Sequence, residues 1–120
     1  MKKGTRILLK RVYENGHAKD GRRILVDRLW PRGIKKDNAK IDLWLKEIAP
    51  SHALRKWFNH KPEKWEEFRR RYLQELDQNQ ECVGQLIQHA KKGNVTLLFS
   101  AKNEVHNNAV ALREYILSRL

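Results

Sequence analysis

Two short apolar runs, Ile24–Val26 and Val95–Phe99, constrain the fold of this chain more than any other feature. Each is shorter than a helix and nearly continuous in apolar residues, which is typical of a strand covered on both faces. A third strand is expected around Ile7–Leu9. A chain of 120 residues has the length of one domain. We therefore predict a single α/β domain over residues 1–120, with three layers and a small, mostly parallel sheet that carries helices on its faces.

The connection between the strand expected around Ile7–Leu9 and the strand at Ile24–Val26 is short. Turn signals at Asn15-Gly16 and Asp20-Gly21 lie between them. Only about ten residues are available there, whereas a parallel crossover normally needs a dozen or more. A hairpin needs no helix and fits this length as easily, so the residues alone leave both pairings open.

Helical spacing of apolar residues recurs in the later segments. The residues Ile41, Trp44, Leu45 and Ile48 predict a helix that begins after a cap at Asp37-Asn38 and ends before Pro50. Ser51 is placed to cap a further short helix, and Pro62 suits the first turn of a longer one. The longer helices are predicted from three apolar faces: Trp65, Phe68, Tyr72 and Leu76; Val83, Leu86, Ile87 and Ala90; and Ala109, Leu112, Ile116 and Leu120.

The formal net charge of +12 is concentrated at the start of the chain. Residues 1–40 hold 13 Lys and Arg against 4 Asp and Glu, whereas residues 41–120 hold 13 against 10. A concentrated basic region attracts phosphate-rich partners, either nucleic acid or a small anion. No nucleic-acid-binding motif accompanies the charge, so a basic surface that serves solubility alone is the other interpretation.

Polar and aromatic residues follow both apolar runs directly. The residues after the first run are Asp27, Arg28, Trp30 and Arg32, and those after the second are Ser100, Lys102 and Asn103. Pro31 and Gly33 favour a turn, so the strand that contains Ile24–Val26 should stop near Trp30. If the two strands are parallel neighbours, both segments emerge at the edge where open α/β sheets bind ligands. The second segment leads into a helix N-terminus, whose free N–H groups favour an anion.

These residue types suit an anionic ligand and, in part, catalysis. Asp27 is a candidate general base, and Lys102 is a candidate for stabilising developing negative charge. The other five are candidate ligand-binding residues: Arg28, Trp30, Arg32, Ser100 and Asn103. The Trp30 indole could stack a planar ligand such as a base. Ser100 has no assigned base, and a hydroxyl nucleophile is inert without one, so the catalytic set is incomplete.

A structural interpretation of the same residues is also open. Asp27 would then pair with a neighbouring Arg, Ser100 or Asn103 would cap the last helix, and Trp30 would pack. A histidine, His52, His60 or His106, could complete a catalytic set only if the fold brings it near Ser100.

Several kinds of site and segment are not expected. The five His show no metal-ligand spacing, the glycines form no phosphate-binding loop, and no cofactor is predicted. The single cysteine, Cys82, cannot form an internal disulfide and is expected to pack as a small residue. No apolar run reaches the length of a signal-peptide core or a membrane span, so we expect a cytoplasmic protein without a membrane partner. The sequence predicts no oligomeric state.

Three segments carry a family resemblance: Val26–Gly33, Leu97–Asn103 and His106-Asn107. Over nearly its whole length, from Lys10 to the last helix, the chain resembles the YeaO-like branch of the domain-of-unknown-function 488 family, which consists of uncharacterised small bacterial proteins. The resemblance implies an α/β fold and parallel first strands, and it implies no function. Larger members have a Cys-containing motif after the late strand. Here the residues read Phe-Ser-Ala-Lys from position 99, so cysteine chemistry is not carried over.

Two functional hypotheses from different classes follow. The first is a pocket for a small anionic ligand at the carboxyl edge of the sheet, in a binding protein or an enzyme for a phosphorylated or carboxylated small molecule. It requires Arg28, Arg32 and Lys102 to converge. The second is a nucleic-acid-associated protein without catalysis. It requires a broad exposed face formed by Lys2, Lys3, Lys10, Arg22, Arg23, Lys35 and Lys36.

Overall fold

The computed structural model describes residues 6–36 and 40–120. The predicted cap at Asp37-Asn38 and the lysines Lys2 and Lys3 lie outside these ranges. The strands are β1 (Ile7–Arg11), β2 (Arg22–Leu25), β3 (Leu43–Trp44) and β4 (Val95–Phe99). The α-helices are α1 (His52–Phe58), α2 (Trp65–Asp77), α3 (Gln80–Lys92) and α4 (Asn108–Leu117), and the 3-10 helices are η1 (Ala18–Asp20), η3 (Lys46–Ile48) and η4 (Pro62–Lys64). The predicted α/β class is confirmed.

The four strands form one sheet in the order β1-β4-β2-β3, and every neighbouring pair is parallel. β4 lies between β1 and β2, and its Leu97 pairs with Leu9 on one side and with Ile24 on the other. The Val26 N–H donates to the Leu98 carbonyl at 3.1 Å, so this pairing continues past the end of β2. The prediction of one parallel sheet is confirmed. The first two strands flank β4 in parallel and do not form a hairpin.

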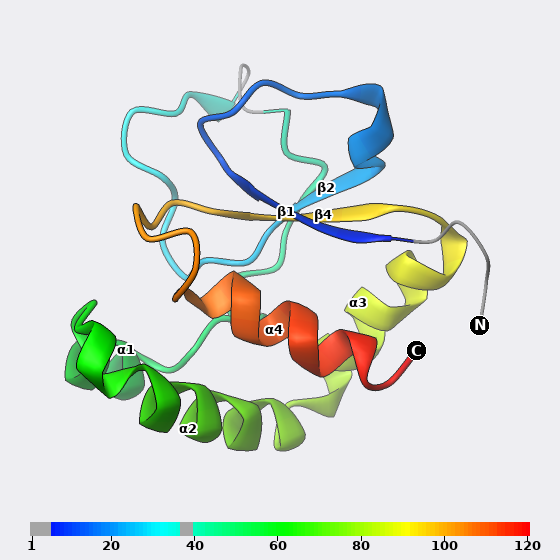
Figure 1. Ribbon diagram of the computed structural model, residues 1–120. Coiled ribbons are helices and arrows are strands. Elements are labelled where there is room, and N and C mark those ends of the chain that lie inside the picture. The colour runs from blue at the N-terminus through cyan, green and yellow to red at the C-terminus, as the bar shows by residue number, and fades with distance from the viewer. Residues whose placement is uncertain (1–5, 37–39) are drawn as a thin grey trace.

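The two faces of the sheet are covered differently (Figure 1). The four α-helices lie on one face, and the larger apolar core lies between them and inward-facing strand residues such as Val26 and Phe99. The long connections on either side of β2 cover the other face together with η1. On that side Leu25 and Leu98 belong to a second, smaller apolar cluster, against which Trp44 packs. The third layer is therefore built mainly from connecting segments.

The helix predicted from Ile41 to Ile48 is wrong, because this segment forms β3 and η3. The Asp42 N–H donates to the Arg23 carbonyl at 2.8 Å, and the Leu45 N–H donates to the Leu25 carbonyl at 2.9 Å. The segment thus extends the sheet along the edge of β2 that β4 leaves open. Its apolar side chains divide between the two faces. Ile41 and Trp44 pack on the smaller cluster, whereas Leu45 and Ile48 belong to the core beneath the helices.

Local signals set the ends of the helices as predicted. The Ser51 hydroxyl accepts a hydrogen bond from the Leu54 N–H at 3.2 Å and caps α1. Asn59 ends α1 in the left-handed conformation, with φ of 46°. Pro62 begins η4, which leads directly into α2. Among the helices within the described ranges, none combines the length and apolar character that a membrane crossing requires.

The turn before β2 needs its glycine. Gly21 has φ of +63°, and a Cβ at this position would lie 2.1 Å from the Asn94 carbonyl oxygen. The next residue, Arg22, donates its N–H to the same carbonyl at 3.0 Å. The turn predicted at Asp20-Gly21 therefore also holds the start of β2 against β4.

Candidate anion-binding site

Asp27 follows β2 at the carboxyl edge of the sheet and contacts the end of β4. Its Oδ2 atom accepts two hydrogen bonds from Ser100, one from the N–H at 2.9 Å and one from the hydroxyl at 2.8 Å. The Asn108 side-chain amide donates to Oδ1 at 3.2 Å and to the Val26 carbonyl at 3.1 Å. Asp27 therefore connects the ends of two strands to the first turn of α4. No ion pair within the described part of the chain includes it.

Two arginines next to Asp27 in space bind backbone carbonyls. Arg11 donates to the Ala101 carbonyl at 2.9 Å and to the Ser100 carbonyl at 2.8 Å, which orders the loop after β4. Arg28 donates to the Ala49 carbonyl at 3.2 Å. It also forms an ion pair at 3.5 Å with Glu47, whose side chain is exposed. Arg11 is thus a structural residue, whereas Arg28 keeps only one weak ionic partner.

Trp30 and Tyr13 lie in the segments next to the strand ends. The Trp30 indole N–H donates to the Ile34 carbonyl at 2.7 Å, and its ring meets Trp44 edge-on with 5.3 Å between centroids. The Tyr13 hydroxyl donates to the Arg32 carbonyl at 3.1 Å. Trp30 therefore packs on the smaller apolar cluster, as the structural interpretation of this residue expected.

The loop from Ser100 to α4 is held by asparagines. The Asn103 side-chain oxygen accepts hydrogen bonds from the N–H groups of Val105 and His106, both at 2.9 Å. Asn107 is the N-cap of α4 and accepts from the Val110 N–H at 3.0 Å. Neither Ser100 nor Asn103 is the N-cap, although both belong to the turn that leads into the helix. Lys102 and Asn103 are exposed.

These segments enclose one cavity of about 920 Å³ at the carboxyl edge of the sheet. All seven predicted site residues line it: Asp27, Arg28, Trp30, Arg32, Ser100, Lys102 and Asn103. Its lining also contains six basic residues against the single carboxylate of Asp27: Arg11, Arg28, Arg32, Arg55, Lys56 and Lys102. The arrangement concentrates positive charge around a concave surface, which suits a small anion.

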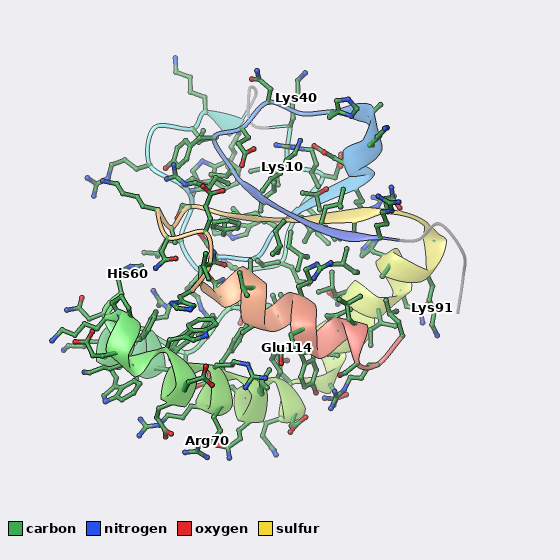
Figure 2. The ribbon with its side chains drawn as sticks, in the orientation of Figure 1. Lys10, Lys40, His60, Arg70, Lys91 and Glu114 are labelled. Atoms are coloured by element: carbon green, nitrogen blue, oxygen red, sulfur yellow. The ribbon has the colours of Figure 1, made fainter. Side chains whose placement is uncertain are left out.

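Helix α1 supplies a wall that sequence reasoning did not foresee. Arg55 and Lys56 line the cavity from this helix, together with the exposed histidines His52 and His60. The chain turns at Asn59 and His60, which both have left-handed backbones, with φ of 46° and 55°. Figure 2 shows His60 at the end of α1. The spacing of the sequence places α1 in the chain, but its position beside the sheet edge depends on tertiary packing.

The histidines considered as partners of Ser100 have different positions. His52 and His60 line the cavity, whereas the His106 ring stacks on Trp65 at 4.9 Å between centroids. Among the described residues, the Ser100 hydroxyl forms its hydrogen bond with Asp27 and with no histidine. The structure thus brings the predicted site residues together at one cavity, and Ser100 forms no pair with a histidine among the described residues.

Burial keeps two other reactive groups protonated. Tyr72 is fully buried, and its hydroxyl donates to the Ile48 carbonyl at 2.7 Å. Burial raises the pKa of Tyr72 well above its ordinary value, and the charges of Glu75 and Asp27 raise it further. Burial also raises the pKa of the Cys82 thiol, which suits a packed residue and not a nucleophile. No group of three or more His, Cys, Asp and Glu within residues 6–36 and 40–120 could hold a metal ion.

A second charged cluster lies on the loop-covered side of the sheet. Asp20 is buried and forms ion pairs with Lys10 at 2.9 Å and with Arg23 at 2.5 Å. Figure 2 shows Lys10 on the side of the sheet away from the α-helices. Burial alone would raise the pKa of Asp20, but hydrogen bonds from Lys10, Arg23 and the His17 N–H outweigh it and lower the pKa.

Two members of this cluster, Lys10 and Arg23, belong to the basic face that the nucleic-acid hypothesis requires. The Arg23 side chain is only 7% exposed, and Lys10 is bound to Asp20, so neither is available as predicted. Arg22, Lys35 and Lys36 are exposed. Two of the seven residues thus do not contribute to a broad basic face.

The chain matches one family model and is similar to several known proteins. A family model described as "Inactive DUF488-N3 subclade" matches residues 6–120. The chain is 48% identical over 112 residues to "Uncharacterized protein YeaO" of Escherichia coli K12, covering 93% of this chain and 97% of the relative. It is 36% identical over 119 residues to "Uncharacterized protein Rv3073c" of Mycobacterium tuberculosis H37Rv, covering 99% of this chain and all of the relative. No solved structure matches the chain at a significant level.

Proposed function

This chain belongs to the DUF488 family, in a subclade described as inactive, and we propose that it binds a small anion at the carboxyl edge of its sheet without catalysing a reaction. The observation that carries the proposal is the composition of the cavity, where six basic residues face one carboxylate. The expected ligand carries a phosphate or carboxylate group, because guanidinium and ammonium groups hold such anions through charge-assisted hydrogen bonds.

The basic residues of the cavity differ in how far they are already engaged. The side chains of Arg32, Lys56 and Lys102 form no hydrogen bond or ion pair with another residue in the described ranges. Arg28 has its 3.5 Å pair with Glu47 and a single carbonyl partner. These side chains can turn to an anion at little cost, since few interactions have to be broken first.

The residues at the strand ends favour binding over catalysis. Ser100 donates its hydroxyl hydrogen to Asp27, which also accepts from the Ser100 N–H and the Asn108 amide. These three hydrogen bonds join Asp27 to the loop after β4 and to α4, so its role is to hold the loop in place. Nucleophilic catalysis by Ser100 would require a base that is free to accept a proton. The description of the subclade as inactive agrees with this assignment.

Calorimetric titration with inorganic phosphate tests the proposal. We expect saturable binding to the wild-type protein, and a dissociation constant about tenfold higher for Arg32→Ala and for Lys102→Ala, since each removes a charge-assisted hydrogen bond. Lys92→Ala is the matched control, because Lys92 is exposed on α3 and does not line the cavity. The proposal fails if wild-type protein binds no phosphate, or if all three variants bind it as wild type does.

Variants of two cavity residues, Arg28 and Lys102, separate this proposal from the nucleic-acid hypothesis. Binding of a short duplex should fall steeply with salt if a basic face neutralises its phosphates. Salt-sensitive duplex binding that survives both Arg28→Ala and Lys102→Ala, in a protein that binds no inorganic phosphate, would favour the nucleic-acid hypothesis instead.

A further inference from the structure

The cavity is apolar as well as basic. Five large hydrophobic side chains among the described residues are exposed to solvent, and two of them are Leu29, which is 69% exposed, and Tyr13, which is 45% exposed. Both line the cavity. Apolar surface left open at the mouth of a basic cavity is typical of a site that buries part of its ligand.

The floor of the cavity is apolar and rigid. Pro50, Phe58 and Phe68 line it, and all three are buried. The rings of Phe58 and Phe68 stack with 4.2 Å between centroids and belong to the core beneath the sheet. Core packing holds these rings, which expose little surface of their own, so they fix the position of the floor while Leu29 supplies most of the exposed apolar surface.

Charged and apolar groups alternate around the cavity. Leu29 lies in the chain between Arg28 and Trp30, and all three line the cavity. On the opposite wall, α1 contributes Arg55 and Lys56 beside Phe58. A bare anion would use the basic groups and leave Leu29 and the floor in water, whereas a ligand with an apolar part would use both.

We infer that the ligand is an anion that carries an apolar group, such as a phosphate or a carboxylate that bears an aryl or acyl group. This inference rests on the proposed function, because the same basic residues hold the anionic group. The apolar group lies against Leu29 and the floor formed by Pro50, Phe58 and Phe68. The gain in affinity comes from removing apolar surface of both partners from water.

Titrations with three probes test the inference: inorganic phosphate, phenyl phosphate and phenol. We expect wild-type protein to bind phenyl phosphate at least tenfold more tightly than inorganic phosphate, and phenol far more weakly than either. Leu29→Ser should weaken phenyl phosphate binding about fivefold and change phosphate binding less than twofold. Val105→Ser is the matched control, because Val105 is 66% exposed and does not line the cavity.

The outcomes separate the inference from the proposed function. Equal affinity for phosphate and phenyl phosphate would overturn the inference and leave the anion site standing. Phenyl phosphate binding that Leu29→Ser and Val105→Ser affect equally would also overturn it, because Leu29 would then have no special part. If neither anion binds, the proposed function fails and the inference fails with it.

Discussion

Asp20 and Asp27 are two carboxylates in the same basic third of the chain, and they meet positive charge in opposite ways. Asp20 is buried between Lys10 and Arg23 and forms an ion pair with each. Asp27 accepts its hydrogen bonds from Ser100 and Asn108, and several of the basic residues that line the cavity with it, such as Arg32 and Lys102, form no ion pair in the described part of the chain. The first carboxylate pairs with its cations inside the fold, whereas the second forms no ion pair with any residue that the structure describes.

Basic residues that lie close together in the sequence therefore have different roles in the fold. The excess of basic residues in positions 1–40 is one feature in the sequence, but the fold divides it between two places. Lys10 and Arg23 hold the connection before β2, whereas Arg28 and Arg32 line the cavity. The first set should therefore affect stability, and the second set should affect ligand binding.

The largest expected effect is that of Asp20→Asn on stability. The change leaves Arg23, with a side chain only 7% exposed, without its ionic partner. Breaking a buried pair by removing one partner costs about 3 kcal/mol or more. Urea denaturation should show this loss in the free energy of unfolding. A loss under about 1 kcal/mol would be the size expected of an exposed pair, and the contrast between the two carboxylates would disappear.

The same variant gives a pH dependence with a definite sign. The pKa of Asp20 is lower in the folded protein than its ordinary value of 3.8, so ionised Asp20 stabilises the fold above that pH. As the pH falls through the folded-state pKa, protonation removes this contribution. The difference in unfolding free energy between wild type and Asp20→Asn should thus be constant near neutral pH and shrink in acid. A difference that grows in acid would contradict the assignment.

Asp27→Asn should have a smaller effect on stability. Asparagine keeps one oxygen that can accept from Ser100, and no buried cation loses a partner. We expect a loss of about 1 to 2 kcal/mol, the size of one or two weakened hydrogen bonds. Amide hydrogen exchange should rise first in the loop from Ser100 to Asn107, since Asp27 holds that loop to the sheet. A loss larger than that of Asp20→Asn would reverse the comparison.

The smallest effect is expected at Glu67, whose ion pairs lie at the surface. Hydrogen bonds from Arg70 and Arg71 lower the pKa of Glu67, yet all three side chains lie at the surface. Solvent screens such pairs, and the free arginines lose nothing by returning to water. Glu67→Gln should leave the urea midpoint nearly unchanged, and an NMR titration of wild type should give a Glu67 pKa only slightly below its ordinary value, since a large drop in pKa on folding would stabilise the fold. A clear drop in the midpoint would mean that exposed pairs matter as much as the Asp20 cluster.

The meeting of the residues that follow the two apolar runs could be predicted, because each strand is recognisable from its own sequence. Ile24–Val26 and Val95–Phe99 are recognisable as buried strands from their composition alone, and parallel pairing then brings Asp27 next to Ser100. Helix ends such as Ser51 and Asn59 depend on capping, which is also local.

The structural features that the sequence did not predict depend on contacts between distant segments. The apolar spacing from Ile41 to Ile48 fits a helix, but β2 offers an open edge that only the assembled sheet reveals. The burial of Arg23 with Asp20 and the approach of α1 to the cavity have the same origin. Periodicity describes one element at a time and carries no information about which neighbour it meets.

Thermal melts of Lys10→Ala and Lys102→Ala, with and without millimolar phosphate, distinguish cations that hold the fold from cations that bind the ligand. Lys10→Ala removes a partner of Asp20 and should melt about 5 °C below wild type, because losing about 1 kcal/mol shifts a domain of this size by several degrees. It should keep the wild-type rise with phosphate. Lys102→Ala should melt within about 2 °C of wild type and lose most of that rise, since a ligand raises the midpoint only as far as it binds the native state. If phosphate shifts no melt, or if Lys10→Ala loses the rise and Lys102→Ala keeps it, the division between structural and ligand-binding cations is contradicted.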